Sequence, residues 1–312
     1  MSKRERSYFD RVQHLRTGRV GDHQRPHKPA MLLAIVDLIA AGKIAGNRIA
    51  YSPELLEVFR RYFDEVRTAD DQPNAHLPYW HLRGDRFFHH APVDGQEAAY
   101  AAVNSVKGPG ELGRLVQYAY LDEELFTLLS DQTGRRQFRD AVIDRYFPNR
   151  RDELLAIAGD EQEIGIYEKA MEERIDDGNR ALPQVREAVR DTAFGRTVRK
   201  AYDYRCAACG IRVVLDDIYI VDAAHLIPFA ESHDDDPRNG IALCKNHHWS
   251  MDRFLIAPGD DLLWHVSGML DDRIEGQRDL IGLRDRSVLV PTNQRYHPRQ
   301  DALRWRQERL LT

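Results

Sequence analysis

The chain has 312 residues, of which 42% are hydrophobic and 30% charged, and its formal net charge is −5. This composition is that of an ordinary soluble protein and argues against disorder and membrane residence. The sequence contains no run of 18 apolar residues, and its N-terminus, M-S-K-R-E-R, lacks the apolar core of a signal peptide. We therefore expect a cytoplasmic protein of two domains. Because the net charge is acidic, any contact with nucleic acid depends on local basic clusters.

The first part of the chain is predicted to be mainly helical. Residues 1–25 have an arginine-rich helical pattern, and the run that follows, A-M-L-L-A-I-V-D-L-I, is apolar enough for a buried helix with Pro29 in its first turn. The letters S-P-E at 52–54 form an N-cap signature before an amphipathic helix over 55–66. The run H-L-P-Y-W-H-L-R-G-D-R-F-F-H-H has two β-rich halves around Gly-Asp, which predicts a hairpin or wing.

Two helices followed by an aromatic hairpin predict a winged-helix-like module; the alternative is a plain α+β scaffold whose aromatic residues form core. Cations beside the buried helix would contact phosphates, while aromatic and proline side chains in the hairpin would form an apolar notch. The candidate binding residues are Arg25, His27, Lys28, Pro29, Pro78, Tyr79 and Trp80.

The middle of the chain predicts helices of opposite charge. Residues 111–157 look helical throughout, and the acidic stretch 160–178 reads as a helical connector between domains, although its charge is equally typical of a solvated face. From 186 to 205 the polarity reverses, and six arginines and lysines give a basic helix that can seat a phosphate backbone. Toward the C-terminus we expect a strand over 262–266 and a helix over 301–310, which could cover the preceding domain or form a dimer contact.

The next segment holds the cysteines of the chain at metal-ligand spacing. Cys206 and Cys209 form a Cys-x2-Cys pair, Gly210 supplies the backbone freedom that a knuckle turn needs, and Cys244 with His247 forms a second pair. These four ligands predict a closed tetrahedral Cys3His site for structural Zn²⁺. The alternative is a redox-active Cys-x2-Cys pair with an unrelated buried cysteine.

Three polar residues are interleaved with these ligands. His225 lies near a predicted strand end, where an imidazole can act as a general base. His248 follows directly after His247, and because neighbours on a helix point about 100° apart, one can face the zinc and the other a catalytic ion. Asn239, in the turn P-R-N-G, can hold the loop that presents His225. Each residue alone is also compatible with an ordinary surface or turn position.

The segment from C-A-A-C-G through D-A-A-H-L-I-P to C-K-N-H-H-W-S-M-D resembles the HNH (ββα-metal) nuclease motif. This resemblance implies that His225 is the general base, Asn239 the orienting asparagine and His248 a ligand of catalytic Mg²⁺ or Mn²⁺. The acid that the family places directly before the first histidine is Ala224 here. Asp222 is the nearest carboxylate upstream and the candidate to replace it.

A second resemblance covers the N-terminal part. R-P-H-K-P-A-M-L-L and L-P-Y-W-H-L-R-G-D, joined to a C-terminal HNH motif, are similar to the sulfur-binding domain of McrA-type (type IV) modification-dependent restriction endonucleases. The resemblance implies recognition of phosphorothioate DNA, in which sulfur replaces a non-bridging phosphate oxygen. Sulfur is larger and less strongly hydrated than oxygen, so a pocket walled by Pro78 and Tyr79 would prefer it.

Together these patterns predict an α+β protein of two domains, a helix-rich winged-helix-like N-terminal domain and a C-terminal zinc-containing ββα-metal (HNH) nuclease domain. We place the recognition domain at 1–158, a helical linker at 159–185 and the nuclease domain at 186–312. The expected activity is cleavage of double-stranded phosphorothioate DNA, by a homodimer if both strands are cut. The alternatives are an HNH nuclease specific for methylated bases and an inactive zinc-stabilised DNA-binding module.

Overall fold

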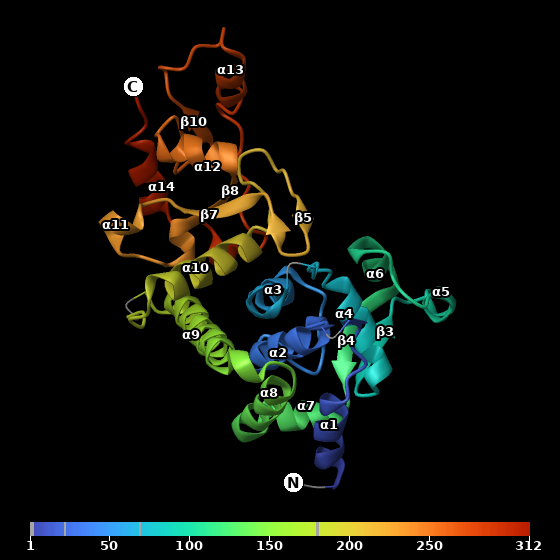
Figure 1. Ribbon diagram of the computed structural model, residues 1–312. Helices are drawn as coiled ribbons and strands as arrows, with labels where there is room; N and C mark the ends of the chain where they lie inside the picture. The colour runs from blue at the N-terminus through green and yellow to red at the C-terminus, as the bar shows by residue number, and fades with distance from the viewer. Residues whose placement is uncertain (1–2, 22, 69, 179–180) are drawn as a thin grey trace. The chain divides into compact units, whose positions relative to one another are not determined.

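The computed structural model describes residues 3–21, 23–68, 70–178 and 181–312, and it divides into two compact units (Figure 1). Unit 1 contains the chain up to Glu163 together with Leu215–Asp217, and unit 2 contains Ile164–Val214 and Ile218–Thr312. Each unit has its own hydrophobic core. The architecture is α+β with helices and short two-stranded sheets, as the sequence predicted.

Unit 1 is rich in helices and is coloured blue to green in Figure 1. Its helices and strands are α1 (Lys3–Gln13), β1 (Arg19–Val20), β2 (His23–Gln24), α2 (His27–Ala40), α3 (Pro53–Val66), α4 (His76–His81), β3 (Phe88–Pro92), α5 (Glu97–Ala102), α6 (Pro109–Leu115), β4 (Val116–Leu121), α7 (Glu123–Ser130), α8 (Gln132–Tyr146) and the first half of α9 (Arg151–Asp176).

Helix α2 is the centre of unit 1. It is apolar on all sides and packs against α3, α4, α7 and α8, which is the environment that a helix without a polar face requires. Its one buried acid, Asp37, accepts hydrogen bonds from Tyr62 Oη and Arg139 Nη2, both at 2.5 Å. Pro29 lies in the first turn, as predicted, where no intrahelical donor is lost.

Helix α3 begins as its sequence predicted. Ser52 is the N-cap, and its side chain accepts a hydrogen bond from the backbone N–H of Leu55 at 3.3 Å. Pro53 occupies the first helical position, where its fixed φ suits the helix.

The hairpin predicted around Gly84-Asp85 is wrong. Residues 76–81 form α4, residues 82–85 a 3-10 turn, and only 88–92 become a strand. That strand, β3, pairs antiparallel with β4, a strand inside the stretch 111–157 that we expected to be helical throughout. The aromatic residues were ambiguous because burial favours them equally in a helix or a strand.

Unit 2 follows in yellow to red (Figure 1). Besides the second half of α9, it contains α10 (Glu187–Ala201), β5 (Val214–Leu215), β6 (Ile218–Tyr219), β7 (Val221–His225), α11 (Phe229–Ser232), β8 (Gly240–Cys244), α12 (Lys245–Asp252), β9 (Ile256–Pro258), β10 (Trp264–Val266), α13 (Glu275–Ile281) and α14 (Gln300–Gln307); Leu215 in β5 is grouped with unit 1. The strand and the final helix expected near the C-terminus are β10 and α14.

The centre of unit 2 is an antiparallel pair of strands followed directly by a helix. β7 pairs with β8 over five residues, and α12 begins at the residue after β8 ends. The basic helix α10 packs across both strands. This is the ββα arrangement that the sequence motif predicted.

The expected linker at 159–185 is helical as far as Asp176, but its helix begins earlier, at Arg151. The units divide within this helix, between Glu163 and Ile164. Its acidic residues are not all solvated, since Glu161 and Glu168 are buried. Part of the linker, residues 179–180, lies outside the described residues. Among the helices described, none combines the length and the apolarity needed to cross a membrane.

We predict that Ser52→Ala weakens the start of α3, because the Leu55 N–H loses its side-chain acceptor. Loss of such a cap costs about 1 kcal/mol, which corresponds to about fivefold faster hydrogen exchange. Mass spectrometry of the full chain should show this change in α3 peptides. Ser130→Ala is the control, because the exposed Ser130 hydroxyl donates to a carbonyl and caps no N–H. Unchanged exchange in α3 would contradict the assignment of the cap.

Candidate functional site

A cluster of ligand atoms is formed by Cys206, Cys209, Cys244 and His247, all within 4.8 Å of one another. The first two lie on a tight turn in which Gly210 has a φ of 73° and its N–H donates to the Cys206 carbonyl at 2.8 Å. Cys244 ends β8, and His247 lies in the first turn of α12. The structure therefore brings together the four residues that were selected by their spacing.

The donor set fits a tetrahedral zinc ion. His247 Nδ1 lies 3.4 Å from Cys206 Sγ and 3.1 Å from Cys244 Sγ, close to the ~3.5 Å between neighbouring ligands of such an ion. A hydrogen bond from the Cys206 thiol, and then one from His247, lower the pKa of the Cys244 thiol, which favours the thiolate that zinc binds. The four protein ligands complete a tetrahedral set, as in structural zinc sites.

The register of β7 and β8 places the predicted catalytic residues at the other end of the ladder. His225 pairs with Gly240, next to Asn239, while Val221 pairs with Cys244 of the metal cluster. Asn239 is fully buried, and its amide oxygen accepts from the Ile227 N–H at 2.9 Å.

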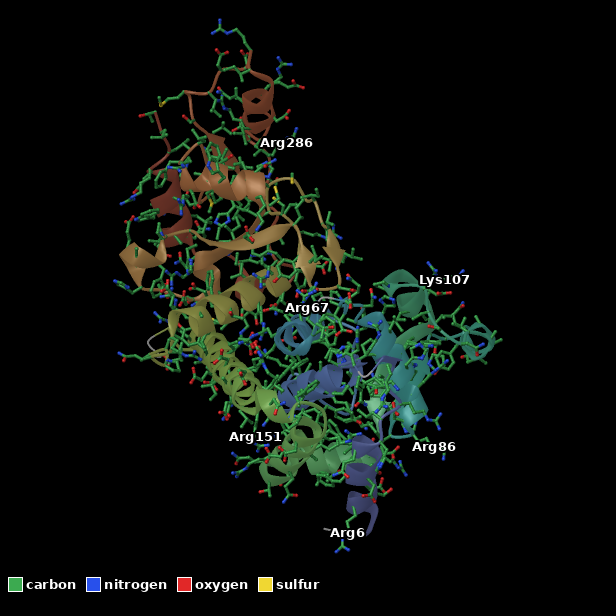
Figure 2. All side chains as sticks on the ribbon, in the orientation of Figure 1. Arg6, Arg67, Arg86, Lys107, Arg151 and Arg286 are labelled. Atoms are coloured by element: carbon green, nitrogen blue, oxygen red, sulfur yellow. The ribbon has the colours of Figure 1, made fainter. Side chains whose placement is uncertain are left out.

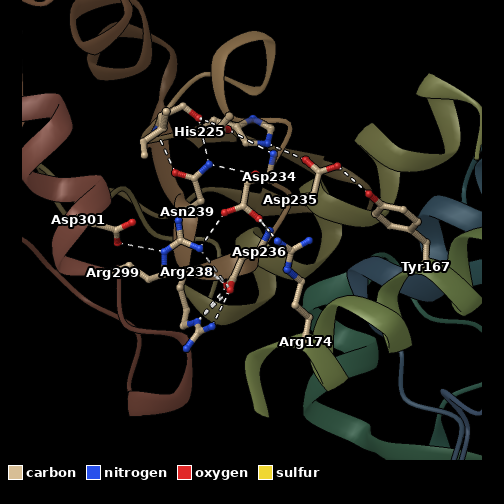
Figure 3. Close-up of polar contacts among 12 residues, drawn as sticks. Tyr167, Arg174, His225, Asp234, Asp235, Asp236, Arg238, Asn239, Arg299 and Asp301 are labelled. Carbon is tan, nitrogen blue, oxygen red and sulfur yellow. Dashed lines mark hydrogen bonds and ion pairs between the residues drawn. The ribbon is translucent and has the colours of Figure 1, made fainter. Parts of the chain in front are cut away.

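The amide group of Asn239 also donates, to the carbonyls of Ile227 and Asp234, both at 3.0 Å (Figure 3). One side chain thereby holds the loop that leaves His225 at two points, on either side of α11. These are the contacts expected of a residue that fixes the loop.

Gly240 is required by close packing against α10. A Cβ atom there would lie 2.4 Å from Val198 Cγ2 and 2.9 Å from Phe194 Cζ. The ring of Phe194 in turn stacks on that of His225, with centroids 3.8 Å apart and planes at 1°. The absence of a side chain at Gly240 lets α10 approach closely enough to support the imidazole.

The imidazole of His225 has a second support that the sequence analysis missed. Its Nε2 lies 2.8 Å from Oδ1 of Asp235, a fully buried carboxylate on the loop before Asn239 (Figure 3). Asp235 carries no spacing signal, because it is one of three consecutive aspartates in a loop.

His248, in α12, lies between two carboxylates. Its Nδ1 is 3.4 Å from Asp222 Oδ2 and its Nε2 is 3.4 Å from Asp252 Oδ2. The two acids thus face opposite ring nitrogens. An ion bound to one of these nitrogens can therefore also bind the carboxylate that faces it. Burial opposes ionisation of Asp222, but hydrogen bonds from Lys245 and His248 hold the pKa of its carboxyl below the ordinary value.

A cavity of about 500 Å³ exposes these groups together. Its lining includes His225 and His248 together with Asp222 and Asp252, and also two arginines of α10, Arg190 and Arg199. The catalytic role of each residue remains a prediction from the motif. The geometry provides a base, a carboxylate–imidazole pair for an ion, and cationic side chains in one place.

A separate cavity, of about 490 Å³, lies in unit 1. Its lining residues are Arg16, Thr17, Gly18, Arg25, His27, Lys28, Asp70, Gln72, Asn74, Leu77, Pro78 and His81. Cationic side chains and apolar side chains therefore meet in one hollow. Arg16 and His81 were not among the predicted binding residues: Arg16 lies outside the quoted motifs, and His81 lies in one of them without being selected.

The cations of this cavity differ in how far they are neutralised. Lys28 is buried and donates to Asp85 at 2.6 Å, whereas Arg25 is partly exposed and donates to Asp71 at 3.0 Å. Burial lowers the pKa of His27 despite its hydrogen bond with the Gln72 carbonyl, so its ring is neutral near pH 7. The exposed charge of the hollow comes mainly from its arginines.

Other predicted binding residues lie beneath this surface. Tyr79 and Trp80 are fully buried, and their polar atoms donate to the carbonyls of Ile49 and Asn104. Pro29 is buried in α2. Pro78 lines the cavity, but the Tyr79 and Trp80 rings of α4 are buried in the core, so this geometry offers no direct contact between them and a ligand.

Unit 1 also has basic residues at its surface that were not predicted to bind DNA. Arg86, for example, is exposed (Figure 2).

Comparison with known families accounts for both units. The model of the ScoMcrA-like DNA sulfur-binding domain matches residues 5–162, slightly more than half of the chain. The chain belongs to this family. The model of the HNH endonuclease matches residues 206–257, which include the metal cluster and the ββα element. The chain thus combines a DNA sulfur-binding domain with an HNH endonuclease domain.

Two solved structures are similar to parts of the chain. One is the modification-dependent restriction endonuclease TagI, with 21% identity and a TM-score of 0.33 over 44% of this chain and 43% of that one. The other is the sulfur-binding domain of ScoMcrA complexed with phosphorothioated DNA, with 20% identity and a TM-score of 0.36 over 49% of this chain and 94% of that one. This chain covers less than half of the TagI chain. The comparison with curated proteins gave no match to this chain.

In unit 2, Arg306 of α14 is a further residue that sequence reasoning missed. It is almost fully buried, and its guanidinium donates to the carbonyls of His225 at 2.8 Å, Leu226 at 2.7 Å and Met251 at 3.3 Å. Burial lowers the pKa of Arg306 to about 10. The side chain joins the end of β7 to the end of α12, so the C-terminal helix helps to position His225.

We predict that Cys209→Ser releases zinc from the HNH domain, because a closed site loses one of its thiolates. The bound zinc should fall from about one ion per chain to near zero, and since zinc binding contributes directly to folding, exchange in β8 and α12 should rise. Plasma mass spectrometry and hydrogen exchange measure the two effects. His233→Ala, at an exposed histidine outside the cluster, should retain the ion. A zinc-free parent protein would contradict the assignment.

Proposed function

We propose that the chain is a restriction endonuclease that recognises phosphorothioate-modified double-stranded DNA through unit 1 and hydrolyses phosphodiester bonds through its HNH domain. The observation that carries this proposal is the presence of both family domains in one chain, each with a cavity lined by suitable groups. The related ScoMcrA domain was solved with phosphorothioated DNA, which supports the choice of ligand.

The cavity of unit 1 suits a phosphorothioate. Leu77 and Pro78 offer apolar surface to the weakly hydrated sulfur, and the neutral ring of His27 adds little desolvation cost. Arg16 and Arg25 supply positive charge for the phosphate. An unmodified phosphate would present a strongly hydrated oxygen to the same apolar wall, which disfavours its binding.

In the HNH domain, we assign His225 the role of general base that removes a proton from the attacking water. Asn239 holds the loop on which this depends. Asp222 and His248 would hold Mg²⁺ or Mn²⁺, which supplies charge neutralisation for the scissile phosphate when bound. Because each HNH centre cuts one strand, we further propose that two copies of the chain act in double-strand cleavage.

The first experiment compares three duplexes of one sequence: unmodified, cytosine-methylated and phosphorothioate-linked. With Mn²⁺ present, we expect the full chain to bind and cut the phosphorothioate duplex at least tenfold better than the others, about 1.4 kcal/mol of discrimination. His225→Ala should bind the same duplex equally well and cut it at least 100-fold more slowly, because loss of a general base costs about 10²–10⁴ in rate.

Each contrary result would reject a different part of the proposal. Preference for the methylated duplex would replace the sulfur assignment by recognition of a modified base and leave the nuclease assignment intact. Parental cleavage by His225→Ala would remove this histidine from the mechanism. No cleavage by the parent in Mg²⁺ or Mn²⁺ would favour an inactive DNA-binding module.

A second prediction concerns Lys245, which donates to both oxygens of Asp222 at 2.5 and 2.7 Å and so competes with an ion for that carboxylate. Lys245→Ala should lower the Mn²⁺ concentration for half-maximal cleavage about threefold, in keeping with an exposed ion pair worth up to about 1 kcal/mol. Lys169→Ala, at an exposed lysine on α9, is the matched control. An unchanged or raised Mn²⁺ requirement would argue against Asp222 as a ligand.

A further inference from the structure

We propose that Asp235 is a positioning residue for His225, and that Tyr167 of α9 fixes Asp235 in turn. This inference rests on the proposed function, because it concerns the histidine that we assign as the base. Neither residue belongs to the motif from which the catalytic residues were predicted, and residue 167 lies outside the segment that matches the HNH family.

The two oxygens of Asp235 have separate partners. Oδ1 lies 2.8 Å from His225 Nε2, and Oδ2 accepts the hydroxyl hydrogen of Tyr167 at 2.9 Å (Figure 3). Burial, and then the Asp235 carboxylate, raise the pKa of Tyr167, so its hydroxyl remains a donor. Arg190 Nε, 3.5 Å from Oδ2, adds positive charge next to the fully buried carboxylate. The buried carboxylate of Asp235 is therefore held in one orientation by these partners.

The contact determines which nitrogen of His225 can act as a base. An ionised carboxylate only accepts hydrogen bonds, so Nε2 carries the proton and Nδ1 carries the lone pair. When Nδ1 takes a proton from water, the positive imidazolium forms directly beside the Asp235 carboxylate and is stabilised by it. The water becomes the attacking hydroxide, and the proton stays on Nδ1.

The ring is also fixed in orientation. Phe194 stacks against one face of it at 3.8 Å, and Arg306 holds the backbone carbonyl of His225 at 2.8 Å. The stacked face and the Nε2 hydrogen bond together leave the imidazole little freedom to rotate. His225 is thus aligned before substrate arrives.

The neighbouring aspartates show what a purely structural role looks like here. Asp234 pairs with Arg174 and Arg299, and Asp236 pairs with Arg238, so the recorded partners of these two carboxylates are arginines and backbone N–H groups (Figure 3). Within the described segment 234–236, Asp235 contacts the imidazole of His225. The same loop therefore supplies a matched control for the proposal.

The test measures single-turnover cleavage of phosphorothioate DNA by the full chain. Asp235→Asn keeps the side-chain volume but presents an amide whose NH₂ can donate to Nε2, which favours the tautomer with the proton on Nδ1. We expect the cleavage rate to fall about 100-fold, within the range for a disabled general base, with the half-saturating DNA concentration changed less than about twofold. Asp234→Asn should keep the cleavage rate within about threefold of the parent.

A double-mutant cycle separates positioning from a structural role. If Asp235 acts through His225, then Asp235→Asn should not reduce the residual rate of His225→Ala further, because residues that act as a unit are not additive. A second 100-fold loss in the double mutant would overturn the proposal. A parental rate for Asp235→Asn, when His225→Ala is inactive, would also overturn it and leave the proposed function standing.

Tyr167→Phe keeps the inference testable if Asp235→Asn fails to fold, as judged by zinc content. It removes one hydroxyl and retains the ring, and we expect a three- to tenfold slower rate with unchanged DNA binding, the cost of about one hydrogen bond. Nitrogen NMR of ¹⁵N-histidine should show the proton of His225 on Nε2 in the parent and on Nδ1 in Asp235→Asn. A proton on Nδ1 in the parent would contradict the proposal.

Discussion

The antiparallel ladder between β7 and β8 is the constraint on which the candidate active site depends. At one end Cys244 pairs with Val221 and belongs to the metal cluster; at the other His225 pairs with Gly240. A slip of one residue would turn every side chain of the strand to the opposite face. Because Cys244 and His247 join the end of β8 to α12 through the metal cluster, this cluster helps to fix the register on which the position of the His225 imidazole depends.

Buried polar groups, rather than apolar contacts alone, hold the loop between these strands. Three polar residues have almost no exposed surface: Asn239, Asp235 and Arg306. Each of them forms hydrogen bonds with the loop or with the end of β7. Such groups are costly to leave unsatisfied, so they favour one arrangement of the loop over its alternatives. The site therefore gains orientation from interactions that contribute little to net stability.

Sequence reasoning succeeded where the chemistry is local. The Cys-x2-Cys and Cys-x2-His pairs and the cap at Ser52 depend on residues a few positions apart, and the structure contains these arrangements. It failed for Arg306, whose hydrogen bonds to the carbonyls of His225 and Leu226 span about 80 residues. It also failed for Asp235, which lies between two other aspartates in the sequence. It also failed at α4, because the pattern of its aromatic residues does not distinguish a buried helix from a strand.

The nuclease motif has an acid where this chain has Ala224, and the two-residue period of a strand explains why Asp222 is the candidate to replace it. Side chains two residues apart share a face, so Asp222 offers its carboxylate on the side of β7 where an acid at 224 would lie, about 7 Å further along. That displacement brings it within 3.4 Å of His248, on the helix that follows β8. We propose that Asp222 and His248 therefore form the metal-binding pair, with the carboxylate two positions earlier on β7 than in the motif, while the small side chain of Ala224 is buried in the strand.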